Sequence, residues 1–520
     1  MRKHRPLACA AAVVGALAIA GPAVAATPTN TKPLRDAVTV SGIREHLAAL
    51  EKIANKNPFR GIPTRATGTP GNVASQQYVI KKMTDAGYNV STQEFGADIF
   101  FEEAPAAFER TSPNPVVYPR YDGQSGVWYT ADFSGDGDST APVTVVDFKE
   151  PNTTASNSNA GCEASDFTGF PAGNIALIQR GSCDFGLKVE NAKAAGASGV
   201  VLFNEGTIGA PDRNDVLIPT LAGYDATGVP VVGTDYATGR DLVDRIGRGE
   251  AVSVRVKVDG FINEGVRTNN VIAETPGGRS DRTVVVGAHL DSVYEGPGIN
   301  DDGSGSATVL ETAEQISALK IKPVNKIRFI FFSGEEQGLL GSDFYSSNLT
   351  KQGVSDISVM LDYDMLGSPN YARFIYDGDG SDFGIPGPNG SGQVEQVFKS
   401  FWDSQGLKYQ TIPFDGRSDY DGFTEVGIPA GGIFAGAEGI KSTLQAGLFG
   451  GTAGAAFDKC YHQLCDNLTN INNKGLGEHK DAAVHAVLTF AQTTSAVNGT
   501  DKGSSNATKE SDWRGDKLVR

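Results

Sequence analysis

Three strongly apolar runs, separated by segments with helical spacing, constrain the fold of the second half of the chain more than any other feature. The runs are Val284 to Ala288, Ile327 to Phe332 and Val359 to Tyr363, and helical spacing extends from Ser306 to Leu319 between the first two. Continuous apolar runs of this length are typical of strands that helices cover on both faces. The pattern therefore predicts an α/β fold with a central sheet between helices.

The beginning of the chain follows the same α/β pattern, and a stretch of different texture then interrupts it. Helical spacing from Ser41 to Ala54 is followed by a second helix candidate, Val73 to Met83, and a short strand. Further on, the chain has short β runs that are broken by Gly, Pro and Asn. We therefore predict a β-rich insert at residues 134–262, which divides an α/β domain into residues 37–133 and residues 263–497.

Both ends of the chain differ in composition from the domains. Residues 1–25 combine a cationic start, an apolar run from Leu7 to Ala20 and the small residues Ala23-Val24-Ala25, which is the pattern of a secretory signal peptide. The apolar run is too short for a stable membrane span, and no second long run follows it. We expect a secreted, extracellular protein without stable membrane association. The tail at residues 498–520, rich in Ser, Asn, Lys and Asp, is expected to be disordered.

The overall charge limits the partners that the protein can bind. The 520-residue chain has a formal net charge of −16 at neutral pH. Nucleic acids and anionic membranes attract basic surfaces, so neither is an expected partner. The charge is better explained by solubility outside the cell.

Four cysteines follow the expected signal peptide, an even number that suits an oxidising compartment. They are Cys162, Cys183, Cys460 and Cys465. Four cysteines allow three pairings, and free buried thiols are the alternative to all of them. We expect the two local disulfides, Cys162 with Cys183 and Cys460 with Cys465.

Histidine and acidic residues follow the apolar runs at the points where the strands are expected to end. His289 and Asp291 close the first run, Glu335 and Glu336 follow the second, and Asp364 follows the third. Sites in open α/β sheets are built at this edge, so these side chains are expected to converge. Each group also has a structural alternative, because a single His-x-Asp can be a hydrogen-bonded core histidine and paired glutamates can form a solvated loop.

Two more candidate groups lie in loops. Asp301 lies in a glycine-rich turn before the helix that starts near Ser306, where an acid can cap the helix or bridge a pair of metal ions. His462 lies between Cys460 and Cys465, where a disulfide would hold the imidazole in place or only staple the loop. Two histidines and four or five acids without a thiolate suit zinc in an open catalytic site.

These motifs, in this order, closely resemble those of the secreted bacterial dizinc aminopeptidases of the leucyl aminopeptidase type, which are related to glutamate carboxypeptidase. The resemblance covers essentially residues 37–135 and 265–495. It implies the zinc exopeptidase fold, in which a mixed central sheet is flanked by helices. The motifs that carry it are His289-Leu290-Asp291, Gly298 to Gly305, Ser333-Gly334-Glu335-Glu336, Asp364-Met365, Arg417-Ser418-Asp419-Tyr420 and Cys460-Tyr461-His462.

The resemblance implies two zinc ions per chain and a set of ligands for them. His289 and Asp364 would hold one ion, Glu336 and His462 would hold the other, and Asp301 would bridge both. The resemblance also implies a cis peptide bond after Asp301. The residues do not decide whether calcium also modulates the activity.

The other matched residues receive roles in substrate binding and proton transfer. The resemblance implies that Glu335 is the general base, that Asp291 lies behind the first histidine ligand, and that Tyr461 steadies the tetrahedral intermediate. The loop at Arg417 would contact the substrate. The implied activity is removal of the first residue, a large hydrophobic one such as leucine, from peptides with a free N-terminus. We expect the enzyme to be a monomer.

The insert resembles a protease-associated (PA) domain. The resemblance rests on Gly181-Ser182-Cys183-Asp184-Phe185, Ala194-Ala195-Gly196-Ala197 and Gly199-Val200-Val201-Leu202. Because relatives of glutamate carboxypeptidase also combine such an insert with a similar metal core, a carboxypeptidase is one alternative function. A catalytically inactive binding protein is the other. Cleavage of N-blocked peptides from the C-terminus would favour the first alternative, and absence of bound zinc would favour the second.

Overall fold

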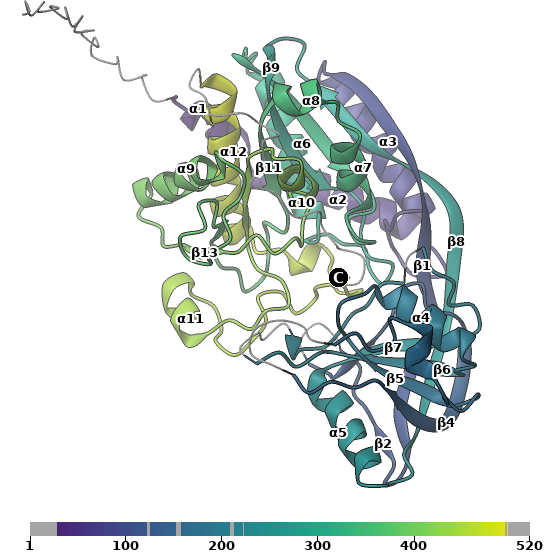
Figure 1. Cartoon of the computed structure of the whole chain (residues 1–520). Coiled ribbons are helices and arrows are strands. Elements are labelled where there is room, and N and C mark those ends of the chain that lie inside the picture. The colour runs from purple at the N-terminus through teal and green to yellow at the C-terminus, as the bar shows by residue number, and fades with distance from the viewer. Residues whose placement is uncertain are drawn as a thin grey trace, which may run out of the picture.

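The computed structural model describes residues 29–121, 125–151, 158–208, 213–221, 223–493 and 497. The expected signal peptide at residues 1–25 and the expected tail at residues 498–520 lie outside these residues. The described chain forms a large α/β lobe and a smaller β-rich lobe, which two long strands connect (Figure 1). Within the described residues, no helix has both the length and the apolar character that crossing a membrane requires.

The described residues form helices and strands along both lobes. The helices are α1 (Lys32–Ala37), α2 (Val40–Lys56), α3 (Pro70–Asp85), α4 (Phe185–Ala194), α5 (Tyr236–Gly247), α6 (Gly303–Ala318), α7 (Leu340–Ser347), α8 (Lys351–Asp356), α9 (Ser391–Ser404), α10 (Asp421–Glu425), α11 (Thr443–Phe449) and α12 (Asn473–Gln492), with short 3₁₀ turns at Ala164–Phe167 and Leu468–Asn470. The strands are β1 (Asn89–Ser112), β2 (Val116–Val117), β3 (Trp128–Thr130), β4 (Gly137–Val146), β5 (Ile175–Gln179), β6 (Gly199–Phe203), β7 (Val231–Thr234), β8 (Ser253–Glu274), β9 (Arg279–His289), β10 (Asn325–Phe332), β11 (Ile357–Tyr363), β12 (Phe374–Tyr376), β13 (Gln410–Ile412) and β14 (Ala430–Phe434).

The sheet of the large lobe has the strand order β13-β12-β14-β11-β9-β10-β8, with β1 on the other side of β8. Strands β10, β9, β11 and β14 are mutually parallel, whereas β8 runs antiparallel to β10, and β12 runs antiparallel to β14 and parallel to β13. The sheet is therefore mixed, as the resemblance implies. The carboxyl ends of its four central parallel strands lie at one edge.

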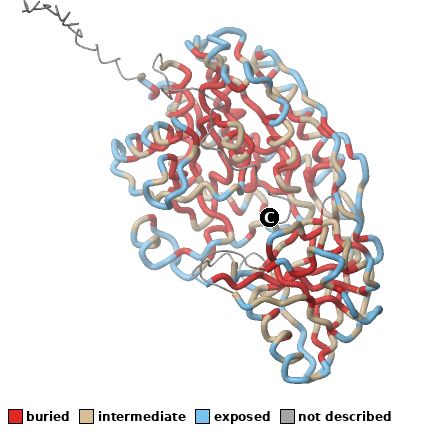
Figure 2. The backbone as a smooth tube through the Cα atoms, in the orientation of Figure 1, coloured by how far each residue is buried: buried red, intermediate tan, exposed pale blue. Residues whose placement is uncertain are grey.

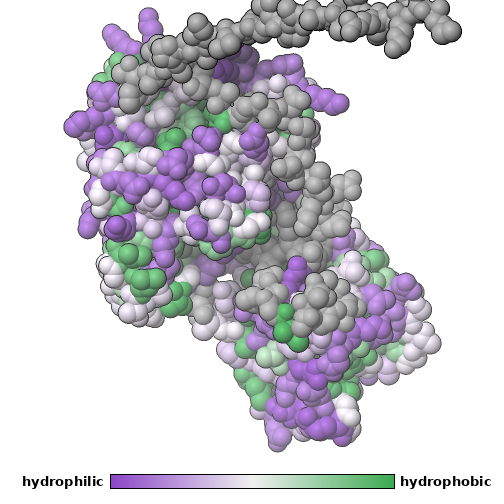
Figure 3. All heavy atoms as spheres, turned by 60° about the vertical axis from the view of Figure 1, so that its left-hand side comes forward, coloured by the Kyte–Doolittle hydropathy of each residue, from purple (hydrophilic) through white to green (hydrophobic). Residues whose placement is uncertain are grey.

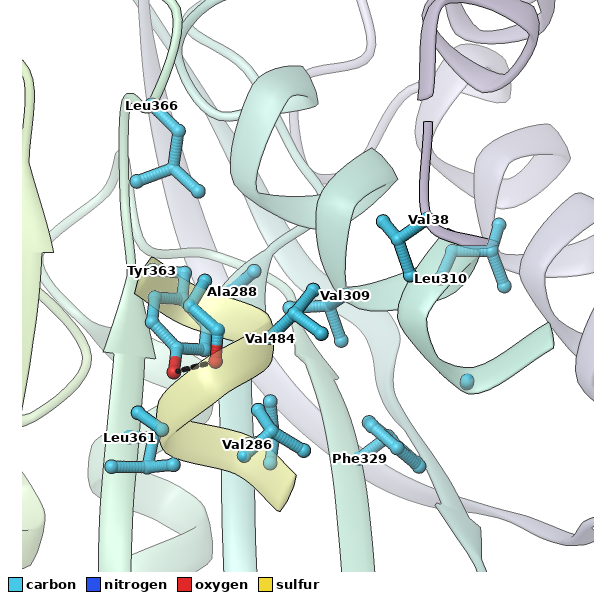
Figure 4. Packing of buried hydrophobic residues seen from close by; sticks show 14 of the residues in the cluster. Val38, Val286, Ala288, Val309, Leu310, Phe329, Leu361, Tyr363, Leu366 and Val484 are labelled. Carbon is cyan, nitrogen blue, oxygen red and sulfur yellow. Dashed lines mark hydrogen bonds between the residues drawn. The ribbon is translucent and has the colours of Figure 1, made fainter. Parts of the chain in front are cut away.

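Alternate residues of the central strands pack into different helical layers, because successive side chains of a strand point to opposite faces. Val286 and Ala288 of β9 face α6 and α12, in the core that Figure 4 shows, and the hydroxyl of Tyr363 donates to the carbonyl oxygen of Ala483 there. Val285 faces the opposite layer, which contains α7, α8 and α10. Most of the buried backbone of the large lobe lies in this three-layer core (Figure 2).

The smaller lobe is attached through a ribbon of two long antiparallel strands, β1 and β8. The inner half of β1, from Asn89 to Ile99, pairs with β8 in the large lobe, and Ala104 to Ser112 pair with β8 in the small lobe. There β8 also pairs with β4, which begins the parallel order β4-β5-β6-β7. Strand β3 pairs with β7, although it precedes the expected boundary at residue 134. The outer part of β1 and β3 thus belong to the same sheet as the insert.

Candidate metal centre

Strand ends bring the predicted histidine and acidic side chains together at one edge of the large sheet. His289 is the last residue of β9, Glu335 and Glu336 follow β10, and Asp364 follows β11 directly. These three strands are parallel neighbours, so their carboxyl ends meet. All four side chains are buried, although each is strongly polar.

The two carboxylate oxygens of Asp301 face different histidines. Oδ1 lies 3.1 Å from Nε2 of His289, and Oδ2 lies 3.3 Å from Nε2 of His462. Oδ1 of Asp364 lies 3.7 Å from the same nitrogen of His289, and Oε2 of Glu336 lies 2.9 Å from that of His462. One carboxylate therefore joins two clusters of metal-ligand type, His289 with Asp364 and His462 with Glu336.

The remaining predicted residues surround these two clusters. Oδ1 of Asp291 lies 3.7 Å from Nδ1 of His289 and accepts a hydrogen bond from the backbone N–H of Glu335 at 3.4 Å. Oε2 of Glu335 lies 3.9 Å from Nε2 of His289. Tyr461 stacks on the ring of His462, with 3.8 Å between the ring centroids. The structure thus brings the sequence-predicted residues to one place.

Loop geometry at the site agrees with two further predictions. Cys460 and Cys465 form a disulfide that encloses His462, and Cys162 forms a disulfide with Cys183 in the small lobe. The peptide bond between Asp301 and the next residue is cis. The local cysteine pairing and the cis bond are confirmed.

The electrostatics of the site favour a bound cation. Burial, reinforced by the charge of Asp301, raises the pKa of Glu336 to about 8. Burial and the charge of Asp364 likewise raise the pKa of Asp362 to about 7. Among the described residues, Oε1 of Glu336, Oδ1 of Asp364 and Nδ1 of His289 are buried without a hydrogen-bond partner. Unpaired buried acceptors cost free energy unless a cation or donor satisfies them, so this donor set fits metal ions.

A cavity opens beside the clusters, and both polar and apolar residues line it. Its polar lining includes Asp301, Glu335, Arg417 and Tyr461. Its apolar lining includes Met365, Tyr376, Ile412, Phe434 and Ala437. A group held at the clusters would therefore meet apolar as well as polar side chains.

Sequence reasoning missed Arg65, whose guanidinium is fully buried beside the site. Its Nε donates to the carbonyl oxygen of Pro297 at 2.9 Å, and its two terminal nitrogens donate to the carbonyl oxygens of Leu290 and Gly298. These carbonyls lie near both ends of the loop 289–301, so Arg65 closes that loop. A single arginine in an irregular segment has no periodicity that could reveal this role.

Asp466 and Asp458 were also missed, and they hold the turn that carries Asp301. The carboxylate of Asp466 accepts from the backbone N–H groups of Asn300 at 2.9 Å and Asp301 at 3.0 Å. Asp458 accepts from the side-chain amide of Asn300 at 2.7 Å. Burial, followed by the charge of Asp458, raises the pKa of Asp466 well above its usual range. The position of Asp466 directly after a cysteine of the predicted loop was the available signal.

Comparisons with known proteins agree with this geometry. Residues 270–487 match the model of peptidase family M28, and residues 139–242 match the PA domain. An aminopeptidase of Pseudomonas aeruginosa (strain UCBPP-PA14) is 41% identical over 477 residues, which cover 92% of this chain and 85% of that protein. The chain belongs to peptidase family M28. Aminopeptidase Y of Saccharomyces cerevisiae is 35% identical to this M28 peptidase, over 89% of this chain and 81% of the yeast protein.

Solved structures show the same fold at lower identity. An aminopeptidase from Aneurinibacillus sp. strain AM-1 aligns with a TM-score of 0.65 and 24% identity, over 91% of this M28 chain and 99% of that chain. BSAP, a zinc aminopeptidase from Bacillus subtilis, aligns with a TM-score of 0.55 and 23% identity, over 88% and 97%. The predicted family, the mixed α/β fold with an inserted PA domain and the prediction of a metallo-aminopeptidase are confirmed.

Proposed function

We propose that this M28 peptidase is a secreted, monomeric aminopeptidase that uses two zinc ions to remove a large hydrophobic residue, such as leucine, from the N-terminus of peptides. The observation that supports this most is the position of Asp301, whose two oxygens face His289 and His462 at 3.1 Å and 3.3 Å. Asp301 would therefore be a ligand shared by both ions.

Each ion would have its own ligands besides the shared carboxylate. His289 and Asp364 would hold one zinc, and Glu336 and His462 would hold the other. The ligands are nitrogen and oxygen atoms without thiolate, and the cavity beside them leaves room for substrate, as a catalytic zinc site requires. When bound, the two ions would polarise the scissile carbonyl and lower the pKa of water.

The protein groups around the ligands would carry the proton transfers. Glu335 would accept the proton of the attacking water and return it to the leaving amine. Tyr461 would donate a hydrogen bond to the carbonyl oxygen as negative charge develops there. Asp291 would fix the orientation of His289 from 3.7 Å, as supporting carboxylates do for metal-bound histidines.

Substrate selection would follow from the residues that line the cavity. The carboxylates at the clusters would attract a free α-ammonium group, and Arg417 would contact the peptide beyond it. Met365, Ile412 and Phe434 are apolar lining residues of the cavity and support a preference for leucine over polar first residues. The pattern of residues 1–25 and the two disulfides support secretion.

Chromogenic substrates that differ only at the amino group test this function. Leucine p-nitroanilide should be hydrolysed, whereas N-acetyl-leucine p-nitroanilide should not, because the acetyl group removes the positive charge that the carboxylates would attract. Aspartate p-nitroanilide is the control for the apolar lining residues and should be cleaved slowly. Equal hydrolysis of the free and acetylated leucine substrates would contradict an aminopeptidase.

A further inference from the structure

Arg417 lies between an acid and the tyrosine beside the metal centre. Its Nη1 lies 2.9 Å from Oε1 of Glu438, and its Nη2 donates to the hydroxyl oxygen of Tyr461 at 3.3 Å. The three residues come from separate loops: one precedes α10, one follows β14, and one lies inside the disulfide loop. The contact therefore connects three parts of the chain beside the cavity that Arg417 and Tyr461 line.

The direction of the second hydrogen bond determines what Tyr461 can donate. A guanidinium has donors and no acceptor, so the phenol oxygen must be the acceptor of the bond from Arg417. The phenol proton is then not used in this contact and is available to another acceptor. The ring is held against His462 at a centroid distance of 3.8 Å, which keeps the hydroxyl beside the metal centre. The hydrogen bond from Arg417 thus leaves the phenol proton available to an acceptor in the cavity that Tyr461 lines.

To donate steadily to Tyr461, the guanidinium of Arg417 needs a second contact that holds it in place, because its side chain is 44% exposed. A long exposed side chain samples many rotamers, and holding it in one of them has an entropic cost. Glu438, whose side chain is 19% exposed, provides a charged acceptor that favours one position of the guanidinium. An ion pair with this exposure contributes little to the free energy of unfolding. We therefore expect its loss to change turnover and to leave the stability of the protein nearly unchanged.

We propose that Glu438 is a positioning residue for catalysis that acts through Arg417. It holds the guanidinium where Nη2 donates to Tyr461, and so directs the phenol proton toward the carbonyl oxygen of the substrate. The proposal rests on the proposed role of Tyr461 as a hydrogen-bond donor to that oxygen. The Glu438–Arg417 pair should therefore affect turnover only when Tyr461 has its hydroxyl group.

A double-mutant cycle tests the proposal in the full-length protein. We expect Glu438→Ala to lower kcat for leucine p-nitroanilide about tenfold, and Glu438→Gln, which keeps an acceptor without the charge, to lie between Glu438→Ala and the unchanged enzyme. In a Tyr461→Phe background, Glu438→Ala should lower kcat no further. The melting temperature and the zinc content of each variant should match the unchanged enzyme, and Glu264→Ala, an exposed glutamate on β8, is the matched control.

Three results would overturn the proposal, and they separate it from the proposed function. Unchanged kcat in Glu438→Ala, together with a slow Tyr461→Phe enzyme, would reject the role of Glu438 alone. An equal loss of kcat on Glu438→Ala in both backgrounds would show that the glutamate acts by a route other than Tyr461. Full activity of Tyr461→Phe would reject the proposed role of the tyrosine itself, and the positioning role with it.

Discussion

Asp301 lies among buried carboxylates whose charges need compensation inside the protein. Hydrogen bonds with His289 and His462 outweigh burial, which by itself would raise the pKa of Asp301, and hold that pKa below its usual range. Burial raises the pKa of Glu336 to about 8, because the charge of His462 and its hydrogen bond do not outweigh burial there. A metal cation bound here would satisfy the unpaired acceptors and compensate the charge of the buried acids.

Arg65 supplies a fixed positive charge and closes the loop between the first two predicted ligands. We expect Arg65→Lys to weaken zinc binding about 10–100-fold, because lysine keeps the charge but lacks the planar set of donors that holds three carbonyls. Titration of the metal-free protein with zinc against a competing chelator measures this. Arg267→Lys, whose side chain is 70% exposed, is the control. Zinc affinity that is unchanged in Arg65→Lys would show that loop closure does not affect the metal centre.

At the level of elements, the apolar runs predicted three central strands of the large sheet. They did not predict which strands distant in the sequence pair with one another. Strands β9, β10 and β11 contain the three apolar runs, and each site residue after them lies where the run ends. This succeeds because burial on both faces demands an unbroken apolar run, and the first polar residues mark its end. The local pattern does not encode that β8 continues from the small lobe into the large sheet, because strand pairing over such distances leaves no periodicity in the sequence.

The same reasoning explains which site residues could be predicted. His289, Asp364 and the two glutamates could be placed because parallel strands converge at one edge. Arg65 and Asp466 lie in irregular segments, and only the folded chain brings them to the loop of Asp301. Residues that support a site from loops are therefore accessible to sequence reasoning only through their neighbours.

On the scale of the whole molecule, the β1–β8 ribbon attaches a separate PA lobe to the catalytic lobe. The surface of the lower part of the view in Figure 3, which contains this lobe, is largely hydrophilic with scattered apolar residues. Each lobe has buried clusters of its own, which lie on both faces of the central sheet in the large lobe and on the sheet of the small lobe. Each lobe thus has a core of its own, as separate domains do.

This arrangement predicts how the PA lobe can be removed. Ala104 and Asp259 are cross-strand partners, so replacing residues 105–258 by an Asn-Gly turn should give a shortened ribbon, a folded catalytic lobe and preserved zinc binding. Hydrolysis of leucine p-nitroanilide should persist, while the preference among longer peptides should change.

Removal of residues 134–259 is the comparison and should give a less stable protein, because β3 loses its partner β7. A soluble, zinc-loaded 105–258 deletion with unchanged length preference would leave the lobe without a role in substrate selection.

The zinc content of three purified proteins, measured together with their turnover, tests the central claim that Glu336 binds metal whereas Glu335 transfers protons. The unchanged enzyme and Glu335→Gln should each contain two zinc ions per chain, with turnover of the variant reduced by roughly 10²–10⁴-fold. Glu336→Gln should lose zinc, because it removes a charged ligand. One zinc per chain in the unchanged enzyme, or equal zinc loss in both variants, would contradict the account.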